Sequence, residues 1–224
     1  MDEIMDDFLK NPGVPEKEEA WWKGPLGIIL ALFLLLLLVV WYVPGEAVKL
    51  DPEPKGIPKL SEVVPEGLTI TQEARSLQPR EYPSFVTPDS TIKQIADKIV
   101  TRSCDGNKVC HAKALYYFVR DNLQYVSDPA AYEYVKSARE SLVAGGGDCD
   151  DAAVLLASLL ESVGINTQFV FVPNHVYIRA LLPEAAKRYK LEDSDYVSLD
   201  PTCRTCAFGE LPYADATKNK VVVS

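Results

Sequence analysis

Hydrophobic and polar positions are distributed very differently in two parts of the chain. Residues 26 to 43 read LGIILALFLLLLLVVWYV and contain no charged residue. A helix of this length spans about 27 Å, close to the roughly 30 Å hydrocarbon core of a bilayer. No second run of this kind occurs in the sequence. The pattern therefore predicts one transmembrane helix over residues 25–43, preceded by a short N-terminal tail at 1–24.

Aromatic residues bracket the apolar run, with Trp21 and Trp22 before it and Trp41 and Tyr42 at its end. Such rings are typical of the two headgroup layers of a membrane. The alternative is a cleaved signal peptide, which has a basic start, a shorter apolar stretch and a small-x-small cleavage site. Here the start is acidic (MDEIMDDF) and VPGEA is a poor cleavage match. These features favour an uncleaved anchor.

Lysines do not decide the orientation of this anchor by the positive-inside rule. Three precede the span and three follow it: Lys10, Lys17, Lys23, Lys49, Lys55 and Lys59. Lys23 lies nearest to the membrane and favours a cytoplasmic N-terminus, and the cysteine content described below agrees. We expect a single-pass protein of the cell membrane with its C-terminal domain outside the cytoplasm.

Residues 44 to 88 contain eight prolines. Proline fixes φ and removes a backbone donor, so this composition predicts an extended, semi-rigid stalk over residues 44–88. The globular domain is then expected over residues 89–224. LTITQEA within the stalk is the part expected to pack on that domain.

Three segments of the domain have helical periodicity, and three shorter ones follow with the character of strands. The first helix starts near Asp89, the second covers about 108–124, and the third runs from Asp150 to Val163 before Gly164. The third is apolar on most sides, which predicts a central buried helix. NTQFVFV, HVYIRALL and DYVSLD are rich in β-branched and aromatic residues. Helices followed by strands predict an α+β fold with a helical layer on an antiparallel sheet.

Charge excludes one class of partner. The chain has 23 Lys+Arg and 32 Asp+Glu, a net charge of −9, and no basic run. Binding to nucleic acid requires a basic face for the phosphates, so no nucleic-acid partner is expected.

Three residues occupy places where cysteine chemistry needs them. Cys149 lies in the first turn of the predicted buried helix, His175 opens a strand and Asp200 closes the next. A helix N-terminus stabilises a thiolate, histidine serves as general base, and a carboxylate fixes the imidazole. The preceding glycines at 145–147 indicate a bare backbone that admits substrate and leaves the Cys149 N–H free as an oxyanion donor; a flexible loop is the alternative.

The segments GGGDCDDAAVLLASLLESVGI, NHVYIRA and VSLDPTC resemble the transglutaminase-like superfamily, a papain-like group of cysteine enzymes, and in particular its single-pass archaeal and bacterial members. The resemblance covers about residues 108–202. It implies that Cys149 is the nucleophile, His175 the base and acid, and Asp200 the orienting carboxylate. It also implies acyl transfer from an amide or peptide carbonyl through a thioester, with a protein or peptide substrate and no cofactor.

The chain departs from the family pattern in two ways. Family members often place Trp near the histidine and before the aspartate, where this chain has Tyr177 and Tyr196. Three carboxylates also surround the thiol: Asp148, Asp150 and Asp151. Asp148 is suited to cap the helix, and negative charge near a thiolate raises the pKa of the thiol. The helix N-terminus and His175 outweigh this effect on the pKa of Cys149 only if these carboxylates point into solvent.

Four further cysteines remain when Cys149 is set aside: Cys104, Cys110, Cys203 and Cys206. In a domain outside the cytoplasm they would form two disulfides and leave one reactive thiol. A zinc site is the alternative, since CxxC suits zinc, but the five-residue gap between Cys104 and Cys110 is wider than usual. We favour the disulfides.

Three functions fit these residues. The first is a membrane-anchored cysteine hydrolase or acyltransferase. The second is a catalytically inactive binding or scaffolding module at the membrane, because a fold does not guarantee chemistry. The third, a metal hydrolase using Cys149, His175 and nearby aspartates, is disfavoured since the only other histidine, His111, lacks a partner motif.

Overall fold

The computed structural model describes residues 23–70, 74–129, 134–191 and 194–224, which form two units, Met1–Ala47 and Val48–Ser224. The first unit contains most of helix α2 (Lys23–Leu50). Within it, Gly24–Val43 is a 20-residue apolar stretch with a mean hydropathy of 3.0. By length and composition this stretch is able to cross a membrane, in agreement with the predicted span. Trp21 and Trp22 lie outside the described residues.

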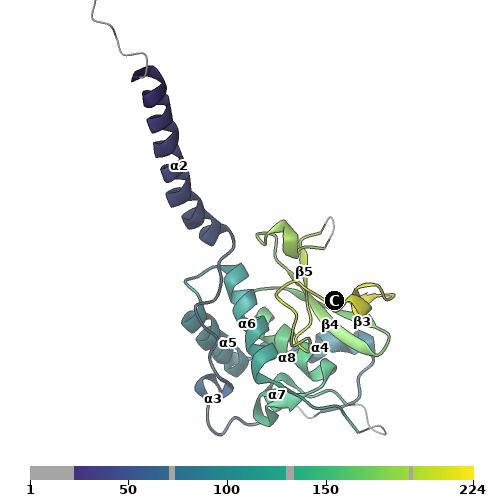
Figure 1. Cartoon of the computed structure of the whole chain (residues 1–224). Helices are drawn as coiled ribbons and strands as arrows, with labels where there is room; N and C mark the ends of the chain where they lie inside the picture. The colour runs from purple at the N-terminus through teal and green to yellow at the C-terminus, as the bar shows by residue number, and fades with distance from the viewer. Residues whose placement is uncertain (1–22, 71–73, 130–133, 192–193) are drawn as a thin grey trace, which may run out of the picture. The chain divides into compact units, whose positions relative to one another are not determined.

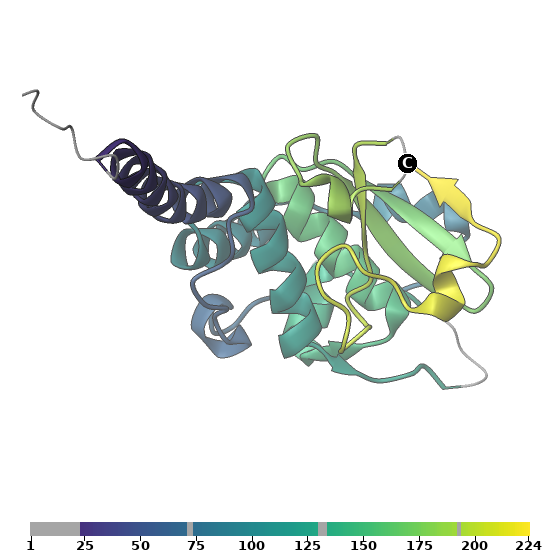
Figure 2. The same ribbon diagram turned by 45° about the horizontal axis from the view of Figure 1, so that its top comes forward.

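The second unit is the predicted α+β domain. An antiparallel sheet of order β5-β4-β3-β6 packs against a layer of helices (Figures 1 and 2). The strands are β3 (Thr167–Val172), β4 (His175–Leu181), β5 (Tyr196–Leu199) and β6 (Val221–Val223). The main helices are α5 (Ser90–Ser103), α6 (Lys108–Asn122), α7 (Ala138–Ala144) and α8 (Cys149–Ser162). Shorter elements are α3 (Leu60–Val63), η1 (Pro79–Glu81), α4 (Tyr82–Phe85), β1 (Gln124–Tyr125), β2 (Gly146–Gly147), η2 (Lys187–Tyr189) and α9 (Tyr213–Ala216).

Helix α8 is the centre of this domain. It contacts α5, α6 and α7 on one side and strands β3 and β4 on the other. Every residue from Ala152 to Leu160 is buried. Gly164 follows with a φ of +77°, a conformation that ends a helix without strain in glycine. The prediction of a central buried helix is therefore confirmed.

The other predicted elements also form. The carboxylate of Asp89 accepts hydrogen bonds from the N–H groups of Thr91 and Ile92 and so caps α5. The apolar stripe of α5 is buried throughout: Ile92, Ile95, Ala96, Ile99 and Val100. The three segments expected as strands are β3, β4 and β5, and all three pair antiparallel. Helix α7 and strand β6 were not predicted.

The proline-rich segment is not a free stalk. Val63 and Phe85 are fully buried in the core of the domain, Tyr82 is nearly so, and the N–H of Lys55 donates to the carbonyl of Ser103. Prolines make a chain extended, but they do not prevent its apolar side chains from packing, and burying one such side chain stabilises by about 1.5–3 kcal/mol. The expected boundary between residues 88 and 89 is therefore wrong, and the compact unit begins at Val48.

A buried ionic cluster holds the start of this segment to the domain. The side chain of Lys113 on α6 has no solvent exposure, and its Nζ lies 2.6 Å from both Asp51 Oδ1 and Glu53 Oε1. Asp51 also accepts from Arg188 and from the hydroxyl of Tyr189. A buried ammonium is stable only with such partners, so the cluster fixes residues 51–53 against α6 and η2.

The four remaining cysteines form two disulfides, as favoured over zinc. Cys104 joins Cys110 and Cys203 joins Cys206, with Cα–Cα distances of 5.9 and 5.3 Å. Both bridges link residues close in sequence, the first between α5 and α6 and the second just after β5. Cys149 is the free cysteine.

Candidate active site

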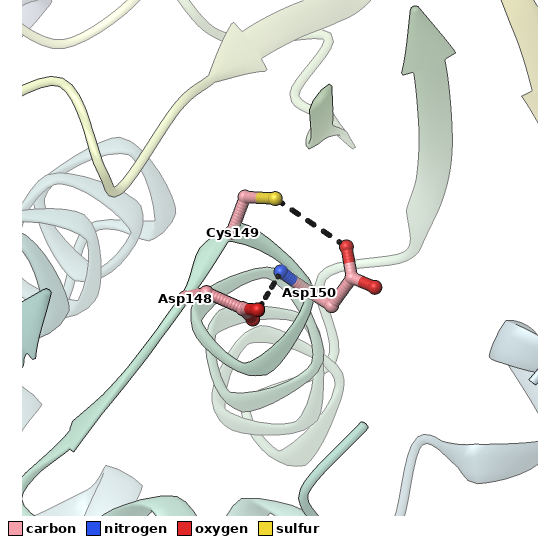
Figure 3. Close-up of side chains that lie close together, drawn as sticks. All are labelled: Asp148, Cys149 and Asp150. Carbon is pink, nitrogen blue, oxygen red and sulfur yellow. Dashed lines mark hydrogen bonds between the residues drawn. The ribbon is translucent and has the colours of Figure 1, made fainter. Parts of the chain in front are cut away.

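Cys149 is the first residue of α8. The carboxylate of Asp148 caps this helix by accepting from the N–H of Asp150 at 3.2 Å (Figure 3) and from the N–H of Asp151 at 3.5 Å. Within the described part of the chain the N–H of Cys149 has no acceptor. The thiol therefore lies at the positive end of the buried helix, beside a free backbone donor.

The three glycines before Cys149 have structural roles. Gly145 ends α7 with a φ of +63°, and Gly146 pairs with Gln124 across β1 and β2. A Cβ on Gly147 would collide with the carboxylate of Asp151. Gly146 and Gly147 are buried and do not line the cavity at Cys149, so the expected substrate path over bare backbone is not seen. Gln124, the partner of Gly146, is exposed and also lies outside that cavity.

His175 and Asp200 are brought together by the sheet. His175 opens β4, and Asp200 follows β5, its neighbour. The His175 Nε2 lies 2.9 Å from Asp200 Oδ2, and Asp200 is 1% exposed. The other carboxylate oxygen, Oδ1, accepts from the N–H and the hydroxyl of Thr202 at 3.0 and 2.7 Å. Asp200 is thus held from both sides.

The charges of this pair support each other. Burial alone would lower the pKa of His175, but the hydrogen bond and charge of Asp200 raise it above its ordinary value. Burial would likewise raise the pKa of Asp200, but His175 and Thr202 lower it below its ordinary value. The carboxylate therefore favours a protonated imidazole and orients its ring.

One cavity of about 480 Å³ contains both the thiol and the imidazole. Its lining consists of Ser76, Leu77, Gln78, Pro79, Tyr82, Val135, Cys149, Asp150, Phe171, Val172, Asn174, His175 and Val176. Because Nε2 of His175 is engaged by Asp200, Nδ1 is the ring nitrogen left for the cavity. Among the described residues no hydrogen bond joins the Cys149 Sγ to this ring.

Asp150 and Tyr82 form the wall next to the thiol. The Cys149 Sγ lies 3.4 Å from Asp150 Oδ1, and the Tyr82 hydroxyl donates to Asp150 Oδ2 at 2.6 Å (Figure 3 shows the first contact). Burial and then the charge of Asp150 raise the pKa of Cys149 to about 12, against the N–H of Val176, which lowers it. The thiol is accordingly protonated at neutral pH. Tyr82 was missed in the sequence because it lies in the proline-rich segment.

Asp148 and Asp151 form hydrogen bonds within the domain and do not face the cavity. Asp148 caps α8, and burial followed by the charges of Asp151 and Asp150 raises its pKa to about 6. Asp151 is fully buried, and Lys136 donates to it through both its N–H and its Nζ, at 2.7 and 2.5 Å. Of the three carboxylates near the thiol, Asp150 alone lines the cavity.

The two tyrosines at the positions of the family's Trp residues differ in their surroundings. Tyr177 is buried, and its ring centroid lies 6.4 Å from that of His175. Tyr196 instead lies under the guanidinium of Arg179, at 4.5 Å. Only Tyr177 therefore neighbours the histidine.

Possible metal ligands fall into two separate groups in the described residues. Asp148, Cys149 and Asp150 have ligand atoms within 4.8 Å of one another, and so do His175, Asp200 and Asp215. A metal hydrolase using Cys149 and His175 together would need both in one group. The grouping disfavours that alternative.

Taken together, a buried helix that starts at cysteine and a sheet that carries the histidine and aspartate define a domain of the cysteine hydrolase and acyltransferase type. Residues 93–201 match the model of the Transglutaminase-like superfamily. The resemblance noted in the sequence is confirmed. A comparison with curated proteins gives no significant match.

Solved structures resemble the fold distantly. LapG of Legionella pneumophila, in its EGTA-treated form, is 16% identical with a TM-score of 0.43, over 75% of this chain and 83% of that protein. A candidate cysteine protease of Cytophaga hutchinsonii is 16% identical with a TM-score of 0.39. That match covers 66% of this chain but only 55% of the length of the Cytophaga protein.

Proposed function

We propose that this protein is a membrane-anchored cysteine enzyme that transfers or hydrolyses an acyl group at an amide or peptide carbonyl. Cys149 would be the nucleophile, His175 the base and acid, and Asp200 the carboxylate that orients the ring. The observation that carries the proposal is one cavity lined by Cys149 and His175, in which the histidine is held by Asp200 at 2.9 Å.

The reaction follows from these groups. His175 Nδ1 takes the thiol proton while Sγ forms a bond to the carbonyl carbon, and the free N–H of Cys149 stabilises the oxyanion. The C–N bond then breaks, and the imidazolium gives its proton to the departing amine. Water or an amine, deprotonated by His175, resolves the thioester and restores the thiol.

The protonation states favour proton transfer during the attack over a thiolate formed beforehand. The pKa of Cys149 is about 12, which burial and then the charge of Asp150 cause. Burial would lower the pKa of His175, but the hydrogen bond and charge of Asp200, together with the charge of Asp215, raise it above its ordinary value. Cys149 is then mainly a protonated thiol in the free site at pH 7, so its proton has to leave as Sγ attacks the carbonyl carbon.

Helix α2 would anchor the domain. The apolar stretch Gly24–Val43 suits a single span, and two disulfides suit a domain outside the cytoplasm. Substrates would then be proteins or peptides at the cell surface.

The test is labelling of the full-length protein in detergent with an electrophilic amide probe, followed by mass spectrometry. We expect one adduct, on Cys149, that is absent in Cys149→Ala and strongly slowed in His175→Ala. His111→Ala, which alters the other histidine on α6, is the matched control and should label at the wild-type rate. Equal labelling of the His175→Ala and wild-type proteins would refute the assigned base.

A non-catalytic module is the second candidate, because the charge of Asp150 opposes thiolate formation in the free site. An inert thiol at pH 7–9, both to the amide probe and to iodoacetamide, would favour this candidate. Rapid alkylation of Cys149 that depends on His175 would favour the enzyme.

A further inference from the structure

The cavity at Cys149 has an unbalanced charge. Of its lining residues, Asp150 is the only acid, and none is lysine or arginine. His175 is the one group able to carry a positive charge there, and its Nε2 is already paired with Asp200. A cavity with a single uncompensated carboxylate favours a cationic occupant.

Asp150 is held in place to act on such an occupant. Tyr82, which is 4% exposed, donates to its Oδ2 at 2.6 Å, so the carboxylate cannot turn freely into solvent. Among the residues that the structure describes, its Oδ1 has only a weak donor, the thiol of Cys149 at 3.4 Å (Figure 3). This oxygen therefore retains capacity to accept from an ammonium or guanidinium group in the cavity.

The same carboxylate links charge recognition to the reactivity of the thiol. A negative charge 3.4 Å from Sγ opposes the formation of a thiolate. A cation bound at Asp150 offsets that charge, and therefore favours the thiolate while it is bound. A positive charge near the reacting carbonyl of a substrate would therefore both strengthen its binding and favour attack by Cys149.

We propose that Asp150 is a specificity-determining residue, which selects substrates carrying a lysine or arginine side chain beside the acyl group that Cys149 attacks. This inference rests on the proposed function and names its substrate class. The neutral lining around Asp150, with Leu77, Phe171 and Val172, suits the methylene stem of such a side chain.

The test compares thiol reagents that differ in charge. Cys149 of the full-length protein, the only cysteine outside the disulfides, is modified by 2-aminoethyl methanethiosulfonate, which is cationic, and by methyl methanethiosulfonate, which is neutral. The rate at which each reagent modifies Cys149 is divided by the rate at which the same reagent reacts with 2-mercaptoethanol, which corrects for its intrinsic reactivity. We expect the cationic reagent to be favoured about 10-fold, equivalent to about 1.4 kcal/mol.

Variants separate charge from shape. Asp150→Asn keeps the size and the acceptor for Tyr82, and should reduce the ratio to about 1. Asp97→Asn, on the exposed side of α5, removes the same charge elsewhere and should keep the 10-fold ratio. Tyr82→Phe keeps the charge of Asp150 but removes the hydrogen bond that holds its carboxylate in the cavity, and should give a ratio between about 1 and 10. A ratio near 1 in the wild-type protein, or an unchanged ratio in Asp150→Asn, would overturn the proposal.

A second pair of reagents distinguishes this inference from the proposed function. Lysyl and norleucyl chloromethyl ketones carry side chains of similar length with and without charge. Preference for the lysyl reagent that is lost in Asp150→Asn supports both. If neither ketone reacts while the methanethiosulfonate ratio persists, the catalytic assignment fails but the cation selection by Asp150 stands.

Discussion

Replacing Lys113 with methionine tests whether the proline-rich segment is part of the folded domain. The substitution keeps the length of the side chain but removes a fully buried ammonium from Asp51 and Glu53. Breaking a buried ion pair from one side costs about 3–5 kcal/mol. Here Glu53 is 61% exposed, and Asp51 keeps Arg188 and Tyr189, so we expect about 2 kcal/mol. For a domain of this size that is a fall in Tm of about 4–8 °C.

The assay must report on the domain rather than on the apolar helix. All three tryptophans lie at or before residue 41, so near-UV circular dichroism of the tyrosines is the suitable signal for the full chain in detergent. Lys93→Met, at an exposed ion pair on α5, is the matched control and should stay within about 0.5 kcal/mol. In an Asp51→Asn background the loss from Lys113→Met should be smaller, because the two side chains are coupled.

The effect should depend on pH with a definite sign. Burial would raise the pKa of Asp51, but hydrogen bonds from Lys113 and Tyr189 and the charges of Lys113 and Arg188 lower it. A carboxyl group with a lowered pKa stabilises the fold above its unfolded pKa of about 3.9 and loses that contribution as the pH falls. The difference between wild type and Lys113→Met should therefore shrink below about pH 4. An unchanged Tm at pH 7, or the same loss in the Asp51→Asn background, would refute the buried ion pair.

Three further predictions concern the core and the site. Phe85→Ala, at a fully buried position in the proline-rich segment, should destabilise the domain by about 3–5 kcal/mol in chemical unfolding. A loss below about 1 kcal/mol would instead support an extended stalk that does not pack on the domain. Thr202→Val removes the hydroxyl that donates to Asp200 at 2.7 Å and should slow labelling of Cys149 by the amide probe about fivefold, with an unchanged circular dichroism spectrum. Asp150→Asn should lower the pKa of Cys149 from about 12, so the rate of iodoacetamide alkylation should rise at a lower pH than in wild type; an unshifted profile would exclude Asp150 as a cause.

The parts of the fold that repeat a simple period were predictable from the sequence. The stripe of α5 and the apolar α8 have helical spacing, and β3, β4 and β5 are short runs between turns. Val63, Tyr82 and Phe85 follow no such period and are interrupted by prolines, so their burial depends on contacts with distant residues. The burial of Lys113 was equally unpredictable, because nothing in the neighbouring sequence indicates that a lysine on α6 pairs with carboxylates about sixty positions earlier.

The candidate site was predictable to the extent that residue type and position in an element determine it. Cys149 starts the buried helix, and His175 and Asp200 meet because β4 and β5 are neighbours. The sequence indicated that Asp148 caps this helix, but it could not reveal how Asp150 and Asp151 differ. Asp148 turns back to cap α8, and Asp151 is buried against Lys136, so both are used by the fold.

Only Asp150 enters the cavity, and it does so because Tyr82 holds it there from a segment far away in the sequence. The condition that the carboxylates point into solvent is therefore not met by Asp150, the one in contact with the Cys149 thiol. In the proposed mechanism, a carboxylate in contact with Cys149 is unfavourable for the free thiolate and becomes favourable once a cation binds. The proline-rich segment, through Tyr82, thus contributes to the chemistry of the site as well as to the core.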